Sequence, residues 1–539
     1  MLLLKGLGSW RVQHAVLGHR TRSMALSVAG TESGAAQSAE VPAQRIVQQA
    51  IAWCGLNSLM YTDGKLNWSH APVTLCPSPY PAVWFEYLRQ IQPMINVLID
   101  NIARDREFLT SCLAPVAEAD PFVRRLLDMY LAVPETTIRT GTNLGILRSD
   151  YMLNDDDSRN LASPSDEPPL QIEMNTIASS FGCLSQKVGD LHRHLLNRYA
   201  DADDMKKILQ VANLGESDTS HHAHIADYIP ENPSIRLLAL SIATAHFLHF
   251  SLEDASAAVL FVVQPGERNV ADQRLLEAEL WDSHRVRVEF MTLAQVATRG
   301  RLGYGNLLLV RPDESSQAEV RVSVAYFRAG YRPEDYPSEA EWRARHMVEE
   351  SLCIKCPTLG YQLAGTKKVQ QALCAEGIME RFVASDMAGS IRRCFAAQYS
   401  LGASATPASL RAIDEAIRDG SEWVLKPQRE GGGNNLYGAE LSAFLRTHAN
   451  DAVLDSYILM QRIFPRPQKA AFLRGGRLDL LPCVSELGIY GTFLGDGVGK
   501  PILNDFAGYL LRTKPVGVDE GGVATGYSVL SSVALTDTI

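Results

Sequence analysis

The sequence predicts a mixed α/β protein with more than one domain, and two observations support this. The chain has 539 residues, which is more than one hydrophobic core usually organises and favours two to four domains. Apolar runs at 257–263 and 286–291 flank a helical pattern at 272–281. A strand–helix–strand unit of this kind implies neighbouring parallel strands.

The other elements follow from the spacing of apolar residues. Helical spacing dominates 41–128 and recurs at 184–198 and 233–250, whereas 154–169 is acidic, rich in Ser and Pro, and predicts an exposed loop. Further strands are expected at 170–177, 307–310, 320–327, 424–426, 457–463 and 486–493. We therefore predict a body formed by 41–256 and 366–539, into which a small parallel-sheet α/β domain, 257–365, is inserted.

Composition narrows the class of protein. The hydrophobic content of 46% and charged content of 21% are ordinary for a soluble globular protein. The net charge of −10 gives no support to nucleic-acid binding, and no apolar run of about 18 residues predicts a membrane span. Nine irregularly spaced cysteines argue against a disulfide framework. The isolated pair Cys353 and Cys356 predicts simple thiols rather than a zinc or redox site.

The N-terminal 40 residues differ in composition from the rest of the chain. Residues 1–31 include Lys5, Arg11, Arg20 and Arg22 but no acidic residue, as in transit peptides of organelles. A flexible extension on a cytoplasmic protein has the same composition. We therefore expect a cytoplasmic protein, with the mitochondrion or plastid as the alternative.

The strongest motif is K-P-Q-R-E-G-G-G-N-N-L-Y-G at 426–438. Three consecutive glycines let several backbone N–H groups approach a phosphate, and Lys426 and Arg429 add positive charge. Glu430 supplies the hard oxygen that Mg²⁺ takes when it bridges nucleotide phosphates. A Walker A loop is excluded, because neither Gly-Lys pair is followed by Ser or Thr. The motif predicts a nucleotide site of another kind.

A second motif, Q-I-E-M-N-T-I at 171–177, lies on an expected strand. Alternation along a strand places Glu173 and Asn175 on one face, roughly 6–7 Å apart. A carboxylate and an amide oxygen so placed can share a Mg²⁺ ion. The alternative is a half-exposed edge strand with two outward polar residues.

Two further motifs carry cations. In L-L-R-T-K at 510–514, Arg512 and Lys514 stand beside a second glycine-rich stretch and suit two adjacent anions, although a solvated basic face is an alternative. In A-G-T-K-K-V-Q-Q at 364–371, Lys367 falls in the first turn of an expected helix, where a cation opposes the helix dipole. That unfavourable placement suggests an anion nearby.

In this order, these motifs resemble those of the eukaryotic-type glutathione synthetases. R-S-D-Y-M at 148–152, F-R-A-G-Y at 327–331 and S-E-L-G-I at 485–489 extend the match over 148–526. The resemblance implies an ATP-grasp fold, in which two α+β portions clamp ATP and glycine-rich loops act as lids. It also implies a homodimer and the ATP-dependent ligation of glycine to γ-glutamylcysteine through an acyl phosphate.

The resemblance also implies roles for individual residues. One or two Mg²⁺ ions would be held by Glu173, Asn175 and Glu430. ATP would contact Glu173, Lys367, Lys426, Pro427, Gln428, Arg429, Glu430, Gly431, Gly432, Gly433, Asn434, Asn435, Tyr437, Met460, Gln461, Arg462, Ile463, Glu486, Lys514 and Glu520. The peptide and amine would contact Arg148, Ile177, Ala178, Ser179, Ser180, Glu267, Arg268, Asn269, Gln273, Arg328, Tyr331, Arg512, Val523 and Ala524. Arg148 and Arg512 would be the catalytic pair.

The sequence departs from the family pattern at a few positions. Ala178 stands where serine is common, Gln461-Arg462 replaces Glu-Lys, and Glu520 replaces Asp. Two alternative functions stay open: a homoglutathione synthetase that uses β-alanine, and a non-catalytic relative. The small Val523-Ala524 pair resembles glycine-using members, and the intact charged residues argue against a non-catalytic relative.

Overall fold

The structure is a computed structural model that describes residues 43–539 except 66, 155–166, 215–221, 250–256, 316–317, 430–432, 450, 499–500, 520, 524–525 and 538–539. The predicted extension at 1–40 and most of the predicted loop at 154–169 lie outside these residues.

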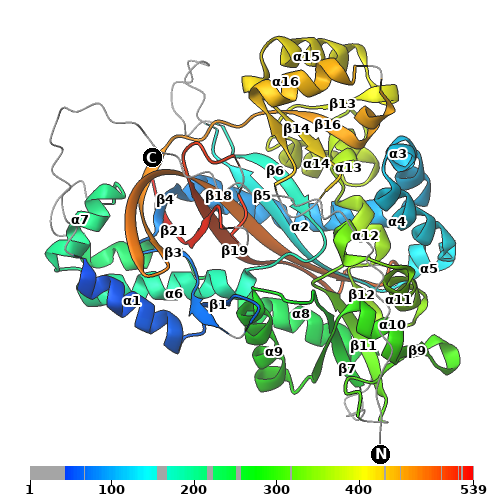
Figure 1. Ribbon diagram of the computed structural model, residues 1–539, viewed down its shortest axis with the longest axis horizontal. Helices are drawn as coiled ribbons and strands as arrows, with labels where there is room; N and C mark the ends of the chain where they lie inside the picture. The colour runs from blue at the N-terminus through cyan, green and yellow to red at the C-terminus, as the bar shows by residue number, and fades with distance from the viewer. Residues whose placement is uncertain are drawn as a thin grey trace, which may run out of the picture. The chain divides into compact units, whose positions relative to one another are not determined.

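A large mixed sheet organises the fold, and thirteen strands join it within the described ranges. Its centre is the long antiparallel pair β18 (Arg477–Gly495) and β19 (Leu503–Pro515). On the other edge of β18 lies β5 (Asn143–Met152), followed by β6 (Leu170–Asn175), both in antiparallel pairing (Figure 1). The strand predicted at 486–493 lies in the C-terminal half of the longer strand β18.

Helices cover both faces of this sheet. Side chains alternate along its strands, so each strand presents residues to both faces. Leu487 and Ile489 of β18 belong to a core shared with α2 (Ala82–Arg104). Tyr490 and Leu494 belong to a second core shared with α6 (Gly182–Tyr199) and α8 (Ser234–His249). The central strands therefore contribute apolar side chains to a core on each face of the sheet.

The predicted βαβ unit is confirmed. β7 (Ala257–Val262) and β8 (Val288–Met291) pair in parallel and are connected through α9 (Val270–His284). β7 also pairs in parallel with β11 (Val320–Phe327), which continues through β12 (Ile354–Cys356) to β5. Since these strands extend the large sheet, the domain boundaries at 257 and 365 stay a prediction.

A smaller sheet forms a second α+β portion with its own core (Figure 1, yellow and orange). Its strand order is β13-β16-β14-β15, and α15 (Pro407–Arg418) and α16 (Gly438–Thr447) pack with it. The strands are β13 (Gln398–Ser400), β14 (Trp423–Pro427), β15 (Leu436–Tyr437) and β16 (Tyr457–Gln461). The strands predicted at 424–426 and 457–463 are thus β14 and β16.

The prediction of a mainly helical 41–128 is right except at 60–81. There the chain forms β1 (Met60–Thr62), β2 (Trp68–His70), β3 (Val73–Thr74) and β4 (Ser78–Pro81). These strands have two to four residues, which is too short for a periodic pattern, and β3 and β4 pair with C-terminal strands. β1 and β2 pair with each other, whereas β3 and β4 are strands only because of distant partners.

The remaining helices are α1 (Gln44–Leu56), α3 (Arg106–Ala119), α4 (Pro121–Ala132), α5 (Glu135–Thr140), α7 (Asp203–Val211), α10 (Leu293–Arg299), α11 (Glu339–Glu350), α12 (Leu359–Ala364), α13 (Lys367–Leu373) and α14 (Ser385–Arg392). The remaining strands are β9 (Gly300–Leu302), β10 (Leu308–Val310), β17 (Gln468–Arg474), β20 (Val529–Ser531) and β21 (Val533–Thr536). None of the helices that the structure describes is long and apolar enough to cross a membrane.

All nine cysteines are free thiols. Cys353 and Cys356 are buried, and burial raises the pKa of Cys356 to about 12. Burial also raises the pKa of Cys353, whose sulfur lies 3.0 Å from the Ser351 hydroxyl. Both sulfurs are therefore protonated at neutral pH.

Acidification is expected to destabilise the fold through His192. This residue of α6 is fully buried between the Ser532 hydroxyl at 2.7 Å and the Thr74 carbonyl at 2.9 Å. Burial lowers its pKa from 6.5 to about 4. Between these values the unfolded chain binds a proton that the folded chain does not, so the free energy of unfolding falls by about 3 kcal/mol as pH drops from 6.5 to 4.

Denaturant unfolding at a series of pH values measures this effect. His192→Asn should flatten the pH dependence of the free energy of unfolding. Equal pH dependence in wild type and His192→Asn would contradict the assignment.

Candidate active site

Three neighbouring cavities lie between the large and small sheets, and each shares walls with the next. The loop cavity, about 520 Å³, is lined by 264–269, Arg328 and 331–334. The central cavity, about 250 Å³, is lined by β5, β6 and the ends of β14 and β19. The strand cavity, about 210 Å³, is lined by 460–465 and 516–519. Ala178, Ser180, Tyr331 and Arg429 join the first two, and Lys426, Tyr437 and Lys514 join the last two.

Two arginines meet at one buried carboxylate beside the central cavity. Arg148 donates from Nε to Asp150 Oδ1 at 2.6 Å, and from Nη2 to Asp150 Oδ2 at 2.8 Å. Arg512 donates to the same Oδ2 at 2.9 Å and also contacts Glu486. Arg148 Nη1 donates to the Ser180 carbonyl at 3.1 Å. The two predicted catalytic arginines are therefore held together from β5 and β19.

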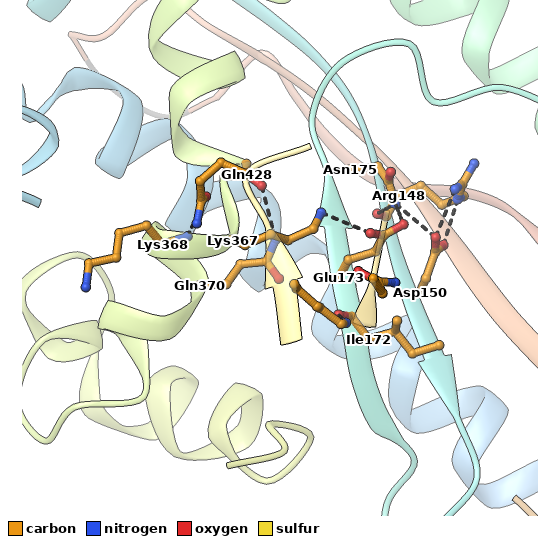
Figure 2. A network of polar contacts seen from close by, with 12 residues as sticks. Arg148, Asp150, Ile172, Glu173, Asn175, Lys367, Lys368, Gln370 and Gln428 are labelled. Carbon is orange, nitrogen blue, oxygen red and sulfur yellow. Dashed lines mark hydrogen bonds and ion pairs between the residues drawn. The ribbon is translucent and has the colours of Figure 1, made fainter. Parts of the chain in front are cut away.

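Lysines and a carboxylate face each other on the opposite side of the cavity. Lys367, at the start of α13, lies 3.0 Å from Glu173 Oε2, as Figure 2 shows. Lys426 donates to the Ile172 carbonyl at 2.8 Å. Burial raises the pKa of Glu173, but Lys367, Lys426 and Arg512 outweigh it and hold that pKa well below its usual range. Glu173 is therefore ionised, and it is the anion that the position of Lys367 suggested.

The predicted metal ligands Glu173 and Asn175 lie together on β6. The Asn175 amide nitrogen is 3.4 Å from Glu173 Oε1, and both side chains line the central cavity. Two hard oxygen donors beside two lysines fit a Mg²⁺ ion. The third predicted ligand, Glu430, lies outside the described residues.

The loop cavity is organised by a second buried carboxylate, Asp272. Its oxygens accept the backbone N–H groups of Phe181, Cys183 and Leu184 at 2.9–3.2 Å, where α6 begins. The same carboxylate accepts Arg328 Nη1 at 3.1 Å. Asp272 therefore ties the cavity arginine to the end of a helix, which leaves little freedom for the arginine to move.

Asn269 gives the loop cavity an unsatisfied polar group. Its side chain is only 2% exposed, and neither amide atom has a hydrogen-bond partner among the described residues. Beside it, Glu267 accepts the Asn269 backbone N–H at 2.8 Å and the Gln273 amide at 3.4 Å. Since an unpaired buried amide is unfavourable, a polar ligand group in this cavity would stabilise it.

The described ends of the glycine-rich motif are tied to neighbouring helices. Arg429 pairs with Asp120, the residue that caps α4, and donates from Nη2 at 3.3 Å. Gln428 accepts the Lys368 backbone N–H at 3.0 Å, which fixes the strand end against α13. The Arg429 side chain of this motif is thus positioned by Asp120, which is remote in sequence.

Two walls of the strand cavity are connected by the ion pair of Arg462 and Asp519, here called the clasp. Arg462 donates to Asp519 at 2.8 Å, and its guanidinium lies 5.4 Å from the Tyr437 ring and 5.6 Å from the Phe464 ring. Lys514 donates to the Asp519 carbonyl at 2.6 Å. The end of β16 and the segment after β19 are therefore connected across the cavity.

Most of the predicted site residues line one of the three cavities. Those that do not are Ser179, Gln273, Pro427, Gln428 and Gly433, among which Gln273 and Gln428 bond to residues next to a cavity. Five predicted residues, Glu430, Gly431, Gly432, Glu520 and Ala524, lie outside the described part of the chain.

Sequence reasoning missed four carboxylates that hold the cations of the site: Asp120, Asp150, Asp272 and Asp519. Asp150 had a usable signal, because it follows Arg148 by two positions on one strand and so shares its face. The other three contact residues that are far away in sequence.

Comparisons with known proteins agree with this geometry. The family profile described as "Eukaryotic glutathione synthase, ATP binding domain" matches residues 40–535. The chain is 38% identical over 506 residues to the chloroplastic glutathione synthetase of Solanum lycopersicum, covering 91% of this chain and 84% of that one. It is 36% identical over 468 residues to the glutathione synthetase of Homo sapiens, covering 86% and 90%.

A solved structure shares the fold. The glutathione synthetase-like effector of Globodera pallida, in its apo form, superposes with a TM-score of 0.66 at 21% identity, covering 92% of this chain and 97% of that one. The match in fold and the extent of the sequence relatives confirm the expected ATP-grasp architecture. The chain therefore belongs to the eukaryotic glutathione synthetase family of ATP-dependent ligases.

Proposed function

We propose that the chain joins glycine to γ-glutamylcysteine at the expense of ATP, giving glutathione, ADP and phosphate. The observation that carries this proposal is the arrangement of the cavities. A polar cavity with buried arginine and amide groups adjoins a central cavity lined by three arginines and three lysines. The latter adjoins a cavity lined by Met460, Ile463 and Phe464 that suits a base. Peptide, phosphates and adenine fit this order.

In the proposed reaction, an oxygen of the cysteinyl carboxylate attacks the γ-phosphorus, and the bond to the departing ADP oxygen breaks. The glycine nitrogen then attacks the acyl carbon, loses a proton, and phosphate leaves. Bound Mg²⁺ would neutralise charge on the phosphates, held by Glu173, Asn175 and, we propose, Glu430. Lys367 and Lys426 lie beside this position to bind phosphate oxygens.

Arg148 and Arg512 are the groups we assign to the carboxylate and to the charge on its oxygen during both steps. Neither arginine needs to move far, because Asp150 already holds them. Gly521, Gly522 and Val523 line the same cavity, and we propose that their loop shields the acyl phosphate from water.

Release of ADP from the purified chain tests this proposal. With γ-glutamylcysteine and Mg²⁺, glycine should support rapid ADP release, and β-alanine should support much less. A preference for β-alanine would favour the homoglutathione synthetase, and no release with either amine would favour a non-catalytic relative. Sedimentation of the same sample tests the proposed homodimer.

We also propose that the protein works in the cytoplasm, with import into a mitochondrion or plastid as the alternative that residues 1–31 raise. The relative from Solanum lycopersicum is named as chloroplastic. Fluorescent fusions with and without residues 1–40 decide between these places.

Breaking the clasp over the strand cavity is expected to weaken nucleotide binding slightly. Arg462 and Asp519 are partly exposed, and such pairs contribute up to about 1 kcal/mol. Asp519→Asn should therefore raise the ATP dissociation constant by about two- to fivefold at low salt, and by less at high salt. Arg477→Gln breaks the exposed pair with Asp479 and serves as the control. A salt-independent effect would contradict this role.

A further inference from the structure

The carboxylate of Asp150 lies where the two halves of the site meet. It is fully buried and does not line the central cavity. Its Oδ1 accepts Arg148 Nε at 2.6 Å, and its Oδ2 accepts Arg148 Nη2, Arg512 Nη2 and Asn175 Nδ2 at 2.8, 2.9 and 2.9 Å. Figure 2 shows Arg148 and Asn175 directed toward it. One side chain thus contacts two substrate arginines and one metal ligand without touching a ligand itself.

Asp150 decides which atom of Asn175 faces the cavity. An amide oxygen at 2.9 Å from a carboxylate oxygen would be repelled, so the amide nitrogen must point to Asp150. The same nitrogen lies 3.4 Å from Glu173 Oε1, which favours the same orientation. Asn175 Oδ1 accepts no hydrogen bond from the described residues and is left for a cation. Only this orientation offers a hard oxygen to Mg²⁺.

Asp150 also fixes the arginines. Arg148 is held on one edge by two bonds to Asp150 and at Nη1 by the Ser180 carbonyl. Arg512 shares Oδ2 with it and also contacts Glu486, so the charge of Asp150 offsets part of the repulsion between two buried guanidinium groups. Asp150 is the carboxylate that holds both arginines at once.

We propose that Asp150 is a positioning residue that aligns the metal ligand Asn175 with the substrate arginines Arg148 and Arg512. This inference rests on the proposed function. It predicts that a substitution of Asp150 weakens the binding of both the peptide and the metal ion, although Asp150 itself lines none of the three cavities.

Asp150→Asn is the main test, because it keeps the shape and removes the charge. We expect the KM for γ-glutamylcysteine and the Mg²⁺ concentration for half-maximal activity each to rise about ten- to hundredfold. Binding of Mn²⁺ with a non-hydrolysable ATP analogue, followed by electron paramagnetic resonance, should weaken similarly. Binding of the analogue without metal should change less than about twofold.

The exchange variant Asp150→Asn with Asn175→Asp separates positioning from simple disruption. It restores a bond between an amide and a carboxylate and places a carboxylate oxygen at the metal position. We expect Mn²⁺ binding to recover, while the KM for the peptide stays high because Arg148 lacks its carboxylate. Failure of Mn²⁺ binding to recover would overturn the proposal.

Asp100→Asn is a matched control. Asp100 of α2 is also a buried carboxylate that accepts from an arginine, Arg104 at 2.8 Å, and from an asparagine, Asn143 at 3.1 Å. It lines none of the three cavities. Asp100→Asn should lower thermal stability without changing the KM or the Mg²⁺ requirement. The same kinetic changes in both variants would overturn the proposal.

A second variant keeps the inference testable if Asp150→Asn does not fold. Gly488 of β18 pairs with Asp150, and a Cβ there would lie 2.6 Å from Asp150 Oδ1 and 2.8 Å from Arg148 Cδ. Gly488→Ala should give a weaker form of the same paired loss, whereas Gly55→Ala in α1, where a Cβ meets nothing, should not. Inactive wild-type protein would refute the proposed function, whereas active wild type with an unaffected Asp150→Asn would refute only this inference.

Discussion

Replacing Arg148 by alanine is expected to lower kcat/KM for γ-glutamylcysteine by about 10²- to 10³-fold, because it removes a buried partner of a charged ligand group. The affinity for ATP should change less than about threefold, since no described contact connects Arg148 with the strand cavity. Steady-state kinetics in the peptide and calorimetric titration with nucleotide measure the two quantities separately.

A control must exclude loss of folding, because among the described residues Arg148→Ala leaves Asp150 with only Arg512 and Asn175 as side-chain partners. Arg345→Ala removes another buried arginine, paired with Glu349 at 2.7 Å and outside the three cavities. It should lower stability at least as much, with kinetic constants of the folded fraction unchanged. Equal losses of peptide and ATP affinity in Arg148→Ala would contradict the assignment.

The sequence predicted those helices and strands whose apolar residues form a clear pattern along the chain. β7, α9 and β8 have an apolar run, a helical stretch and another apolar run in close succession, and the structure confirms the parallel unit. β3 and β4 have two and four residues and depend on pairing with β17, β20 and β21, which lie about 400 to 460 residues away. No local pattern can predict such strands, because their stability comes from long-range contacts.

The residues of the site also divide into those that a local pattern predicts and those that depend on remote partners. Glu173 and Asn175 were placed together correctly because two residues along one strand share a face. For Lys367 the sequence suggested only an unidentified anion nearby, and the structure identifies one such anion as Glu173. Asp272 and Asp120 could not be predicted, because their partners Arg328 and Arg429 come from remote elements. The sequence thus predicts groups that bind ligands more readily than the carboxylates that hold those groups.

This difference has a physical origin. A ligand group belongs to a motif whose composition suits the ligand, whereas a supporting carboxylate is recognised only by the cation it meets in the folded chain. In this protein each of three buried or partly buried arginines, Arg148, Arg328 and Arg429, has such a partner. The partners offset the positive charge of the site and keep the cations near the positions that anionic ligands require.

Glu173→Gln is expected to reduce the rate of ligation by at least about 10³-fold, because it removes a charged metal ligand from the phosphoryl-transfer site. The pKa of Glu173 lies well below its usual range, so the wild-type group stays ionised as pH falls from 8 to 5. Its contribution to metal binding should therefore be constant over that range. Turnover at saturating Mg²⁺ and metal affinity at each pH measure both effects.

The same substitution should not weaken, and should strengthen, the binding of metal-free ATP. Lys367 and Lys426 are at most 5% exposed, and the Glu173 carboxylate offsets part of the positive charge of Lys367. Without the negative charge of Glu173, less of the positive charge of the lysines is offset, and phosphates can offset it instead. Titration with ATP in the presence of a chelator, compared with turnover in Mg²⁺, would therefore show opposite changes. Near-normal turnover of Glu173→Gln at ordinary Mg²⁺ would refute the metal assignment, and loss of ATP binding without metal would indicate that Glu173 positions the lysines instead.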